Sequence, residues 1–254
     1  MHGDDPAARP FAERLVAHRG HAQVAPENTL AAVRSALAAG ARFVEVDLQL
    51  AADGVPWLLH DRTLERMCGV AGSLAERDSA ALAALRAGEA ARFGRRFADE
   101  PLATLDGLVG LLARHPAAHV YVEVKRAALE VFGARRVLDE VLPRLAPLTG
   151  RWTLISFDLG VLQLARKVAD VALGPVLEAW GQKDEPATAA LEPDVIFCDV
   201  LRLPADGPLA LPAPLVVYEI DRAEQARALF ARGVARVESF AVGALLAALE
   251  AGPA

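Results

Sequence analysis

The 254-residue sequence is poor in cysteine, in long apolar runs and in positive charge, and each shortage excludes a class of protein. Its two cysteines, Cys68 and Cys198, lie far apart without zinc-site spacing, so we expect a reduced compartment and no disulfide framework. No apolar run is long enough to insert stably in a membrane. The formal net charge of -6 argues against binding to nucleic acid. The first fifteen residues lack the basic-then-apolar order of a signal peptide, so a cytoplasmic location is expected.

What the sequence does contain is a hydrophobic fraction of 54%, arranged as short apolar runs that alternate with Ala/Leu-rich helical patterns. Strands that are apolar almost throughout and separated by helices indicate parallel pairing with both faces covered. Eight such strands are predicted, over residues 14–18, 42–48, 119–125, 152–157, 171–177, 194–199, 215–220 and 235–239. Helices are predicted over residues 28–39, 105–114, 134–145, 159–168, 223–231 and 242–250.

Eight strand–helix units in a chain of this length predict the α/β class and a (β/α)8 TIM barrel, as one domain over residues 1–254. The helical signal is weak between residues 177 and 194, and no helix is predicted after residue 199. The alternative, a doubly wound open sheet, requires a glycine-rich turn after the first strand. The sequence there, "HRGHAQVAPEN", is not such a turn.

Two segments interrupt the alternation. Asp53-Gly54 separates two apolar runs, which predicts a β-hairpin; reflection about this turn places His60 opposite Asp47, with a shift of one residue if a bulge is present. Residues 62–101 then form a stretch too long for an ordinary loop, with no strand to add to the barrel. We interpret it as a small inserted cap over the carboxyl-terminal mouth.

Chemically active side chains gather at the predicted strand ends. In a TIM barrel these ends meet at one mouth, where catalytic groups lie. Residues two apart in a strand point to the same face, which applies to the pairs Glu45/Asp47 and Glu123/Lys125. We therefore expect one site containing His18, Arg19, Glu45, Asp47, His60, Glu123 and Lys125.

This set of side chains suits phosphoryl transfer. Three crowded carboxylates repel one another unless a cation neutralises them, and all-oxygen ligands favour Mg²⁺ or Ca²⁺ over zinc. Arg19 and Lys125 suit an anionic substrate group such as a phosphate. His18 and His60 can serve as acid and base near neutral pH.

Each fragment also has a purely structural interpretation. Glu-x-Asp and Glu-x-Lys in strands are commonly ion-paired, His18 alone could be a strand-end histidine, and "PENT" is an acceptable helix start with Asn28 as N-cap. The coincidence of these fragments at strand ends favours the site. No such support exists for His2, His21, His115 and His119, which we interpret as structural, and the same holds for both cysteines.

The sequence resembles the glycerophosphodiester phosphodiesterase family, a group of phosphatidylinositol-phospholipase-C-like phosphodiesterase barrels. The matching motifs are "AHRG", "PENTLAAVRSALAAGARFVEVDLQLAADGVPWLLHDRTLER", "PLATLDGLVGLL", "YVEVKR" and "SFD", in the family's order. The resemblance implies that His18 and His60 are catalytic, that Glu45, Asp47 and Glu123 bind a divalent metal, and that Arg19 and Lys125 hold the phosphate. It also implies the inserted cap after His60.

The expected function is metal-dependent hydrolysis of glycerophosphodiesters to an alcohol and glycerol 3-phosphate, through a cyclic phosphate. Two alternatives are a lysophospholipase D and a barrel that binds such compounds without turnover. The sequence departs from the family late in the chain, at Tyr218-Glu219-Ile220-Asp221, where Trp-Thr-Val-Asn is common, and at Glu238. It leaves open the role of these residues, the preferred alcohol and cation, which histidine is the base, and the oligomeric state.

Overall fold

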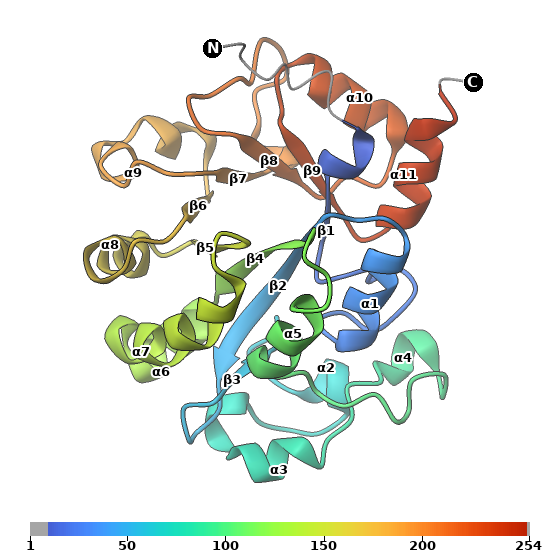
Figure 1. Ribbon diagram of the computed structural model, residues 1–254, viewed down its shortest axis with the longest axis vertical. Helices are drawn as coiled ribbons and strands as arrows, with labels where there is room; N and C mark the ends of the chain where they lie inside the picture. Colours follow the sequence, from blue (N-terminus) through green and yellow to red (C-terminus); the bar gives the residue numbers. More distant parts are fainter. Residues whose placement is uncertain (1–9, 253–254) are drawn as a thin grey trace.

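The computed structural model, which describes residues 10–252, contains a closed barrel of eight parallel strands (Figure 1). The barrel closes because β1 pairs with β2 on one side and with β9 on the other. All eight predicted strands are confirmed, as β1 (Leu15–Ala17), β2 (Phe43–Leu50), β4 (His119–Val124), β5 (Trp152–Ser156), β6 (Leu173–Leu177), β7 (Ile196–Asp199), β8 (Leu215–Tyr218) and β9 (Arg236–Ser239).

Helices surround the barrel (Figure 1), and the six predicted ones are present as α1 (Leu30–Ala38), α5 (Leu105–Leu112), α7 (Ala134–Leu145), α8 (Leu159–Val168), α10 (Ala223–Ala231) and α11 (Val242–Glu250). A further helix, α6 (Arg126–Phe132), lies between β4 and α7 and was not predicted. Where the helical signal is weak, the chain forms only short turns: η5 (Trp180–Asp184), α9 (Pro186–Ala189) and η6 (Val200–Arg202). Short 3-10 turns also occur at η2 (Phe11–Glu13) and η4 (Ala146–Leu148).

Alternation along the strands divides the apolar side chains between two faces. On β1, Leu15 and Ala17 belong to the large core under the helices, whereas Val16 belongs to a smaller cluster that includes Tyr121 and Phe197. The same alternation on β2 places Val44, Val46 and Leu48 in the large core. Glu45 and Asp47 therefore point to the opposite face, into the barrel, as predicted from their spacing.

The hairpin is confirmed, with its register shifted by the one residue that the prediction allowed for. The strands β2 and β3 (Pro56–Leu58) pair with Leu48 opposite Leu58, so Leu59, not His60, lies opposite Asp47. The reason is a three-residue loop with Gly54 at φ 86°, a turn that shifts the pairing by one residue relative to a two-residue turn.

Residues 62–101 form four short helical segments, α2 (Glu65–Cys68), η3 (Leu74–Glu76), α3 (Ser79–Ala83) and α4 (Ala90–Phe93), next to β3 (Figure 1). They pack around an apolar cluster of their own that includes Trp57, Leu64, Leu74 and Leu82. That this segment is an inserted cap within a single domain stays a prediction.

Residues 1–9, including His2 and most of the segment without a signal-peptide pattern, lie outside the described residues. Between residues 10 and 252, no helix has both the length and the apolarity to span a bilayer.

Protonation of His119 should destabilise the fold at acidic pH. Its Nε2 lies 2.9 Å from Thr153 Oγ1; burial, with Arg236 and Arg151 nearby, lowers its pKa to about 4. In the unfolded chain the pKa is about 6.5, so the unfolded state binds the proton more readily and stability falls as the pH drops from about 6.5 towards 4. In urea unfolding across this window, His119→Gln should flatten the decrease, whereas the exposed His115→Gln should not. If the free energy of unfolding changes equally with pH in the wild type and in both variants, this role of His119 is contradicted.

Candidate active site

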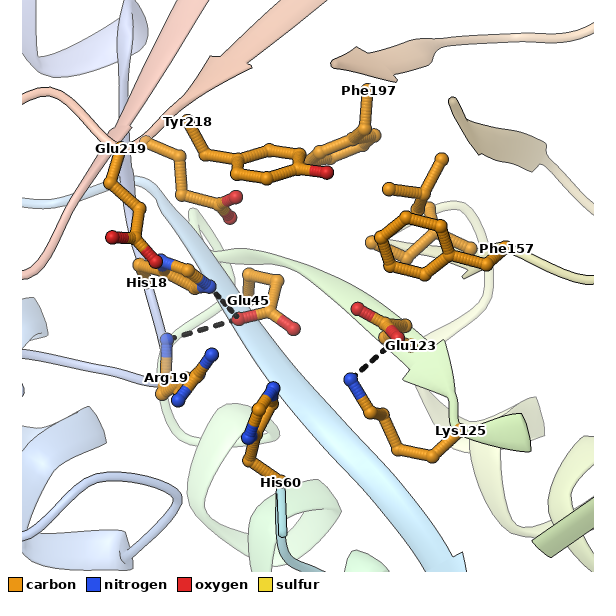
Figure 2. Close-up of a pocket in the computed structure, with 13 residues that line it drawn as sticks. His18, Arg19, Glu45, His60, Glu123, Lys125, Phe157, Phe197, Tyr218 and Glu219 are labelled. Atoms are coloured by element: carbon orange, nitrogen blue, oxygen red, sulfur yellow. Dashed lines mark hydrogen bonds and ion pairs between the residues drawn. The ribbon is translucent and has the colours of Figure 1, made fainter. Parts of the chain in front are cut away.

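The predicted site residues come together at one cavity, at the carboxyl ends of the barrel strands (Figure 2). Six of the seven line it: His18, Arg19, Glu45, His60, Glu123 and Lys125. The seventh, Asp47, is 1% exposed and lies behind Arg19 and Lys125, with which it forms ion pairs. The structure thus brings all seven residues together.

Three carboxylates form the deepest part of the site. Ligand oxygens of Glu45, Asp47 and Glu123 lie within 4.8 Å of one another, and Asp47 and Glu123 are direct neighbours across β2 and β4. Burial and the nearby Asp47 carboxylate raise the pKa of Glu45 well above its usual value and that of Glu123 to about 7. Asp47 differs: although burial raises its pKa, Lys125 and Arg19 reverse the effect and hold it below its usual range.

This carboxylate triad fits a hard divalent cation. All three donors are oxygens, and Glu45 Oε1 is buried without a hydrogen-bond partner among residues 10–252. Carboxylate clusters of this kind suit Mg²⁺ or Ca²⁺, which also removes the mutual repulsion.

Two basic side chains lie beside the triad. Lys125 Nζ is 2.8 Å from Glu123 Oε1 and 3.2 Å from Asp47 Oδ1. Arg19 has a positive φ of 55°, which lets its backbone N–H donate to Glu45 Oε2 at 3.0 Å. Its guanidinium donates to Glu27 Oε1 at 2.9 Å. The carboxylates raise the pKa of both basic groups against the opposing effect of burial, so both stay charged.

The two histidines have different surroundings. His18 is buried, stacks on Phe240 with 4.5 Å between ring centroids, and has its Nε2 3.8 Å from Glu45 Oε2. The His60 side chain is 35% exposed, and its Nδ1 lies 3.0 Å from Asp61 Oδ1. Burial lowers the pKa of both rings, and the charge of Arg19 lowers both further.

Asn28 supports the triad and is not the helix cap suggested by the sequence. Thr29 caps α1, with its hydroxyl accepting from the backbone N–H of Ala32. Asn28 instead has a left-handed φ of 56°; its Nδ2 donates to Asp47 Oδ2 at 2.8 Å and its Oδ1 accepts from the Asp47 N–H at 2.9 Å. Asparagine tolerates this conformation better than most residues, but the sequence indicated only a possible cap at Asn28.

Three further polar residues near the site were not predicted. Glu27 and Asp61 each accept a hydrogen bond from Arg66 of α2, at 2.6 and 2.7 Å. Glu27 also contacts Arg19, and Asp61 contacts His60. Their only signal in the sequence is proximity to His60 and Asn28, because the contacts join separate segments of the chain. His21 Nδ1 lies 3.2 Å from Ser35 Oγ and both cysteines are free; the structural roles expected for these residues stay predictions.

Comparison with known proteins finds similarity to glycerophosphodiester phosphodiesterases. The model of the glycerophosphoryl diester phosphodiesterase family matches residues 18–207. Glycerophosphodiester phosphodiesterase 1 of Mus musculus is 35% identical over 130 residues, 51% of this chain and 39% of that protein. A glycerophosphodiester phosphodiesterase of Caldanaerobacter subterraneus is 37% identical over 91 residues, 36% of this chain and 37% of that protein. The matches thus span about two fifths of these curated relatives.

Two solved structures share the fold. An Oleispira antarctica phosphodiesterase in complex with the product sn-glycerol-3-phosphate superposes with a TM-score of 0.81 at 22% identity, over 93% of this chain and 96% of the other. A glycerophosphodiester phosphodiesterase from Agrobacterium tumefaciens superposes with a TM-score of 0.74 at 24% identity, over 92% and 99% of the two chains. The predicted TIM barrel is therefore confirmed.

Proposed function

The chain belongs to the glycerophosphoryl diester phosphodiesterase family, and we propose that it hydrolyses glycerophosphodiesters to an alcohol and glycerol 3-phosphate. The observation that carries this proposal is the single cavity in which two histidines and two basic side chains surround a carboxylate triad (Figure 2). The relatives' names and the sn-glycerol-3-phosphate held by the Oleispira phosphodiesterase support the same chemistry.

Glu45, Asp47 and Glu123 would hold one divalent cation, Mg²⁺ or Ca²⁺. Such a cation supplies polarisation of a phosphate oxygen and a lowered pKa for a hydroxyl group beside it. Arg19 and Lys125 flank the triad and bind the phosphate; the planar guanidinium suits two oxygens at once, and the ammonium acts as a point charge.

We assign the base to His18 and the acid to His60. The buried His18 ring lies beside the triad, with its Nε2 3.8 Å from Glu45 Oε2, where the attacking glycerol hydroxyl has to lose its proton. The more exposed His60 ring is oriented by Asp61 and can protonate the departing alcohol. Attack by the glycerol hydroxyl gives a cyclic phosphate and the free alcohol, and water then opens the ring with the two proton-transfer roles exchanged.

Two other functions are less consistent with the site. A lysophospholipase D would use apolar side chains of residues 62–101 at the mouth, but in the described part of the chain the cavity is lined by none of them. A barrel that only binds phosphodiesters would have no use for the pair of histidines. Turnover of glycerophosphocholine without turnover of lysophosphatidylcholine supports the proposal; the reverse result favours lysophospholipase D, and binding without turnover favours a carrier.

The Asn28 side chain should strengthen metal binding by fixing Asp47. Asn28→Gly keeps a residue that adopts positive φ readily but removes both hydrogen bonds to Asp47. We expect Mg²⁺ or Ca²⁺ affinity to fall about 10–100-fold, the usual effect of losing an outer partner of a metal ligand. Calorimetric titration measures this effect, and Asn28→Asp tests it separately because a carboxylate cannot replace the donated bond. Unchanged affinity in both variants would show that Asp47 is held by other groups.

The remaining features of the proposal concern the whole chain. We propose that residues 1–254 act as one barrel domain with the 62–101 insertion beside the mouth, on a small-molecule substrate in the cytoplasm. Separate fractionation of cells expressing the chain tests the location.

A further inference from the structure

The cavity has two chemically different sides (Figure 2). One side carries the basic groups Arg19, Lys125 and His60. The other side comes from the ends of β5, β7, β8 and β9, and we call it the acidic aromatic wall: Phe157, Phe197, Tyr218, Glu219 and Glu238. The basic side accounts for the phosphate, but the proposed reaction as described above gives the wall no role.

Glu238 is the feature of the wall that requires a ligand. It is 2% exposed, its Oε1 has no hydrogen-bond partner among the described residues, and no ion pair to it occurs there. One of its carboxylate oxygens lies within 4.8 Å of a ring nitrogen of His18 and of a carboxylate oxygen of Glu45, and its side chain lines the cavity. A buried carboxylate without a partner is costly unless a positive charge or a proton donor is supplied.

The other residues of the acidic aromatic wall indicate which kind of ligand group would fit beside Glu238. Three aromatic rings line the same space, and the Glu219 side chain, 44% exposed, lies nearer the solvent with its Oε1 3.5 Å from His18 Nδ1. Aromatic faces combined with carboxylates attract an organic cation, through the ring quadrupoles and through charge. A purely hydrocarbon group would fill the space but supply neither a positive charge nor a proton donor to Glu238.

We propose that the acidic aromatic wall selects substrates whose alcohol carries an ammonium group. This rests on the proposed function: with the phosphate at Arg19 and Lys125, one ester arm extends to the wall, and we assign the variable alcohol to it. Glu238 and Glu219 are then specificity residues, and glycerol, common to all substrates, occupies the side of the triad.

The test compares two substrates of the same shape, glycerophosphocholine and the 3,3-dimethylbutyl ester of glycerol 3-phosphate, in which carbon replaces the quaternary nitrogen. For the wild type we expect kcat/KM to favour the choline ester by roughly 10-fold or more, the scale of a desolvated cation–aromatic contact. Glu238→Gln should bring this ratio close to one, and Glu219→Gln should lower it less. The exposed Glu224→Gln, which does not line the cavity, should leave it unchanged.

Two results would overturn the selectivity alone: a wild-type ratio near one, or an equal loss for both substrates in Glu238→Gln, which would place Glu238 at the common glycerol. If Glu238→Gln does not fold, the selectivity is tested by the ratio of kcat/KM for the two esters in the wild type and in Glu219→Gln. Wild-type protein that hydrolyses neither ester would overturn the proposed function together with this inference.

A separate observation concerns Arg66 on α2, in the 62–101 insertion. Its guanidinium donates to both oxygens of Asp61 at 2.7 and 2.9 Å, to Glu27 Oε1 at 2.6 Å and to Glu89 Oε1 at 3.1 Å. Asp61 contacts His60, and Glu27 contacts Arg19. One side chain therefore reaches two site residues, each through a single carboxylate.

We infer that Arg66 is a positioning residue for both His60 and Arg19. Without it, the buried Glu27 carboxylate keeps Arg19 as its remaining basic partner among the described residues and competes with the phosphate for that guanidinium. Asp61 likewise loses the bidentate contact that fixes its orientation towards His60.

Arg66→Ala should lower kcat/KM for glycerophosphocholine by about 10–100-fold, as is typical for an outer partner of a site residue. Millimolar guanidinium should restore part of the loss, whereas Arg66→Lys should not, because an ammonium cannot bridge both carboxylates. Arg62→Ala is the matched control, since Arg62 belongs to the same insertion but pairs only with the exposed Glu130 in the described chain. Full activity in Arg66→Ala, or a loss that follows thermal stability and does not respond to guanidinium, would overturn the inference while wild-type turnover upholds the function.

Discussion

Chelation with EDTA should abolish hydrolysis of glycerophosphodiesters by this chain, and adding back Mg²⁺ or Ca²⁺ should restore it. This result is expected because the three carboxylates of the triad repel one another when no cation lies between them. The cation also supplies positive charge for the reaction, which is lost with it. Measuring turnover of glycerophosphocholine before and after dialysis, with each ion added separately, also identifies the preferred cation. Full turnover by protein shown to be metal-free would contradict the assignment.

Glu123→Gln tests the same site through a single ligand. Removing a residue that hydrogen-bonds to a metal ligand typically lowers metal affinity ~10–100-fold. Glu123→Gln should lower the cation affinity by more than this, because it alters a ligand itself. It should still fold, because removing one of three buried, mutually repelling carboxylates relieves repulsion. Glu130→Gln, an exposed change on α6, is the matched control and should keep wild-type affinity.

Replacement of either histidine should cause the second large loss. His18→Ala and His60→Ala should each lower kcat by roughly 10²–10⁴-fold, the range for general acid–base groups. The double variant should lose far less than the product of the two factors, because the residues act as one unit. A kcat close to that of the wild type in both single variants would show that these histidines have a structural role and no catalytic one.

The choice of leaving group separates their roles. A p-nitrophenyl diester barely requires an acid, so it should restore much of the activity of His60→Ala and little of that of His18→Ala. Selective rescue of His18→Ala would reverse the assignment, and equal rescue of both would contradict any division into acid and base. His21→Ala is an internal control, because His21 contacts Ser35 and does not line the cavity.

The strands and most helices could be predicted because burial on both faces leaves a pattern in the sequence itself. The α6 helix could not: it has seven residues and one buried side chain, too few for a helical period to emerge. The register of the β2–β3 hairpin could be predicted only to within one residue, because the position of the turn around Asp53-Gly54 depends on backbone angles that composition does not reveal.

The site was predictable to the extent that its residues lie at strand ends. Strand ends are ordered by the barrel, so proximity of Glu45, Asp47 and Glu123 follows from topology. Contacts made by Asn28 and Arg66 depend instead on how loops pack across the mouth, over separations of 19 and 39 residues. Glu238 was noted as unusual, but the lack of a hydrogen-bond partner for its buried Oε1 among residues 10–252 follows from the folded cavity alone.

The closure of the barrel by β1 and β9 has a consequence for biosynthesis. His18 donates its backbone N–H to Ser239 and stacks on Phe240, so its position depends on residues more than two hundred places later in the chain. While the polypeptide emerges from the ribosome, the strand that carries His18 keeps one open edge until β9 is made. Pairing over such a separation is slow to form. The site around His18 is therefore complete only after residues 236–240 have been synthesised, and until then the open edge of β1 is exposed to pairing with other chains.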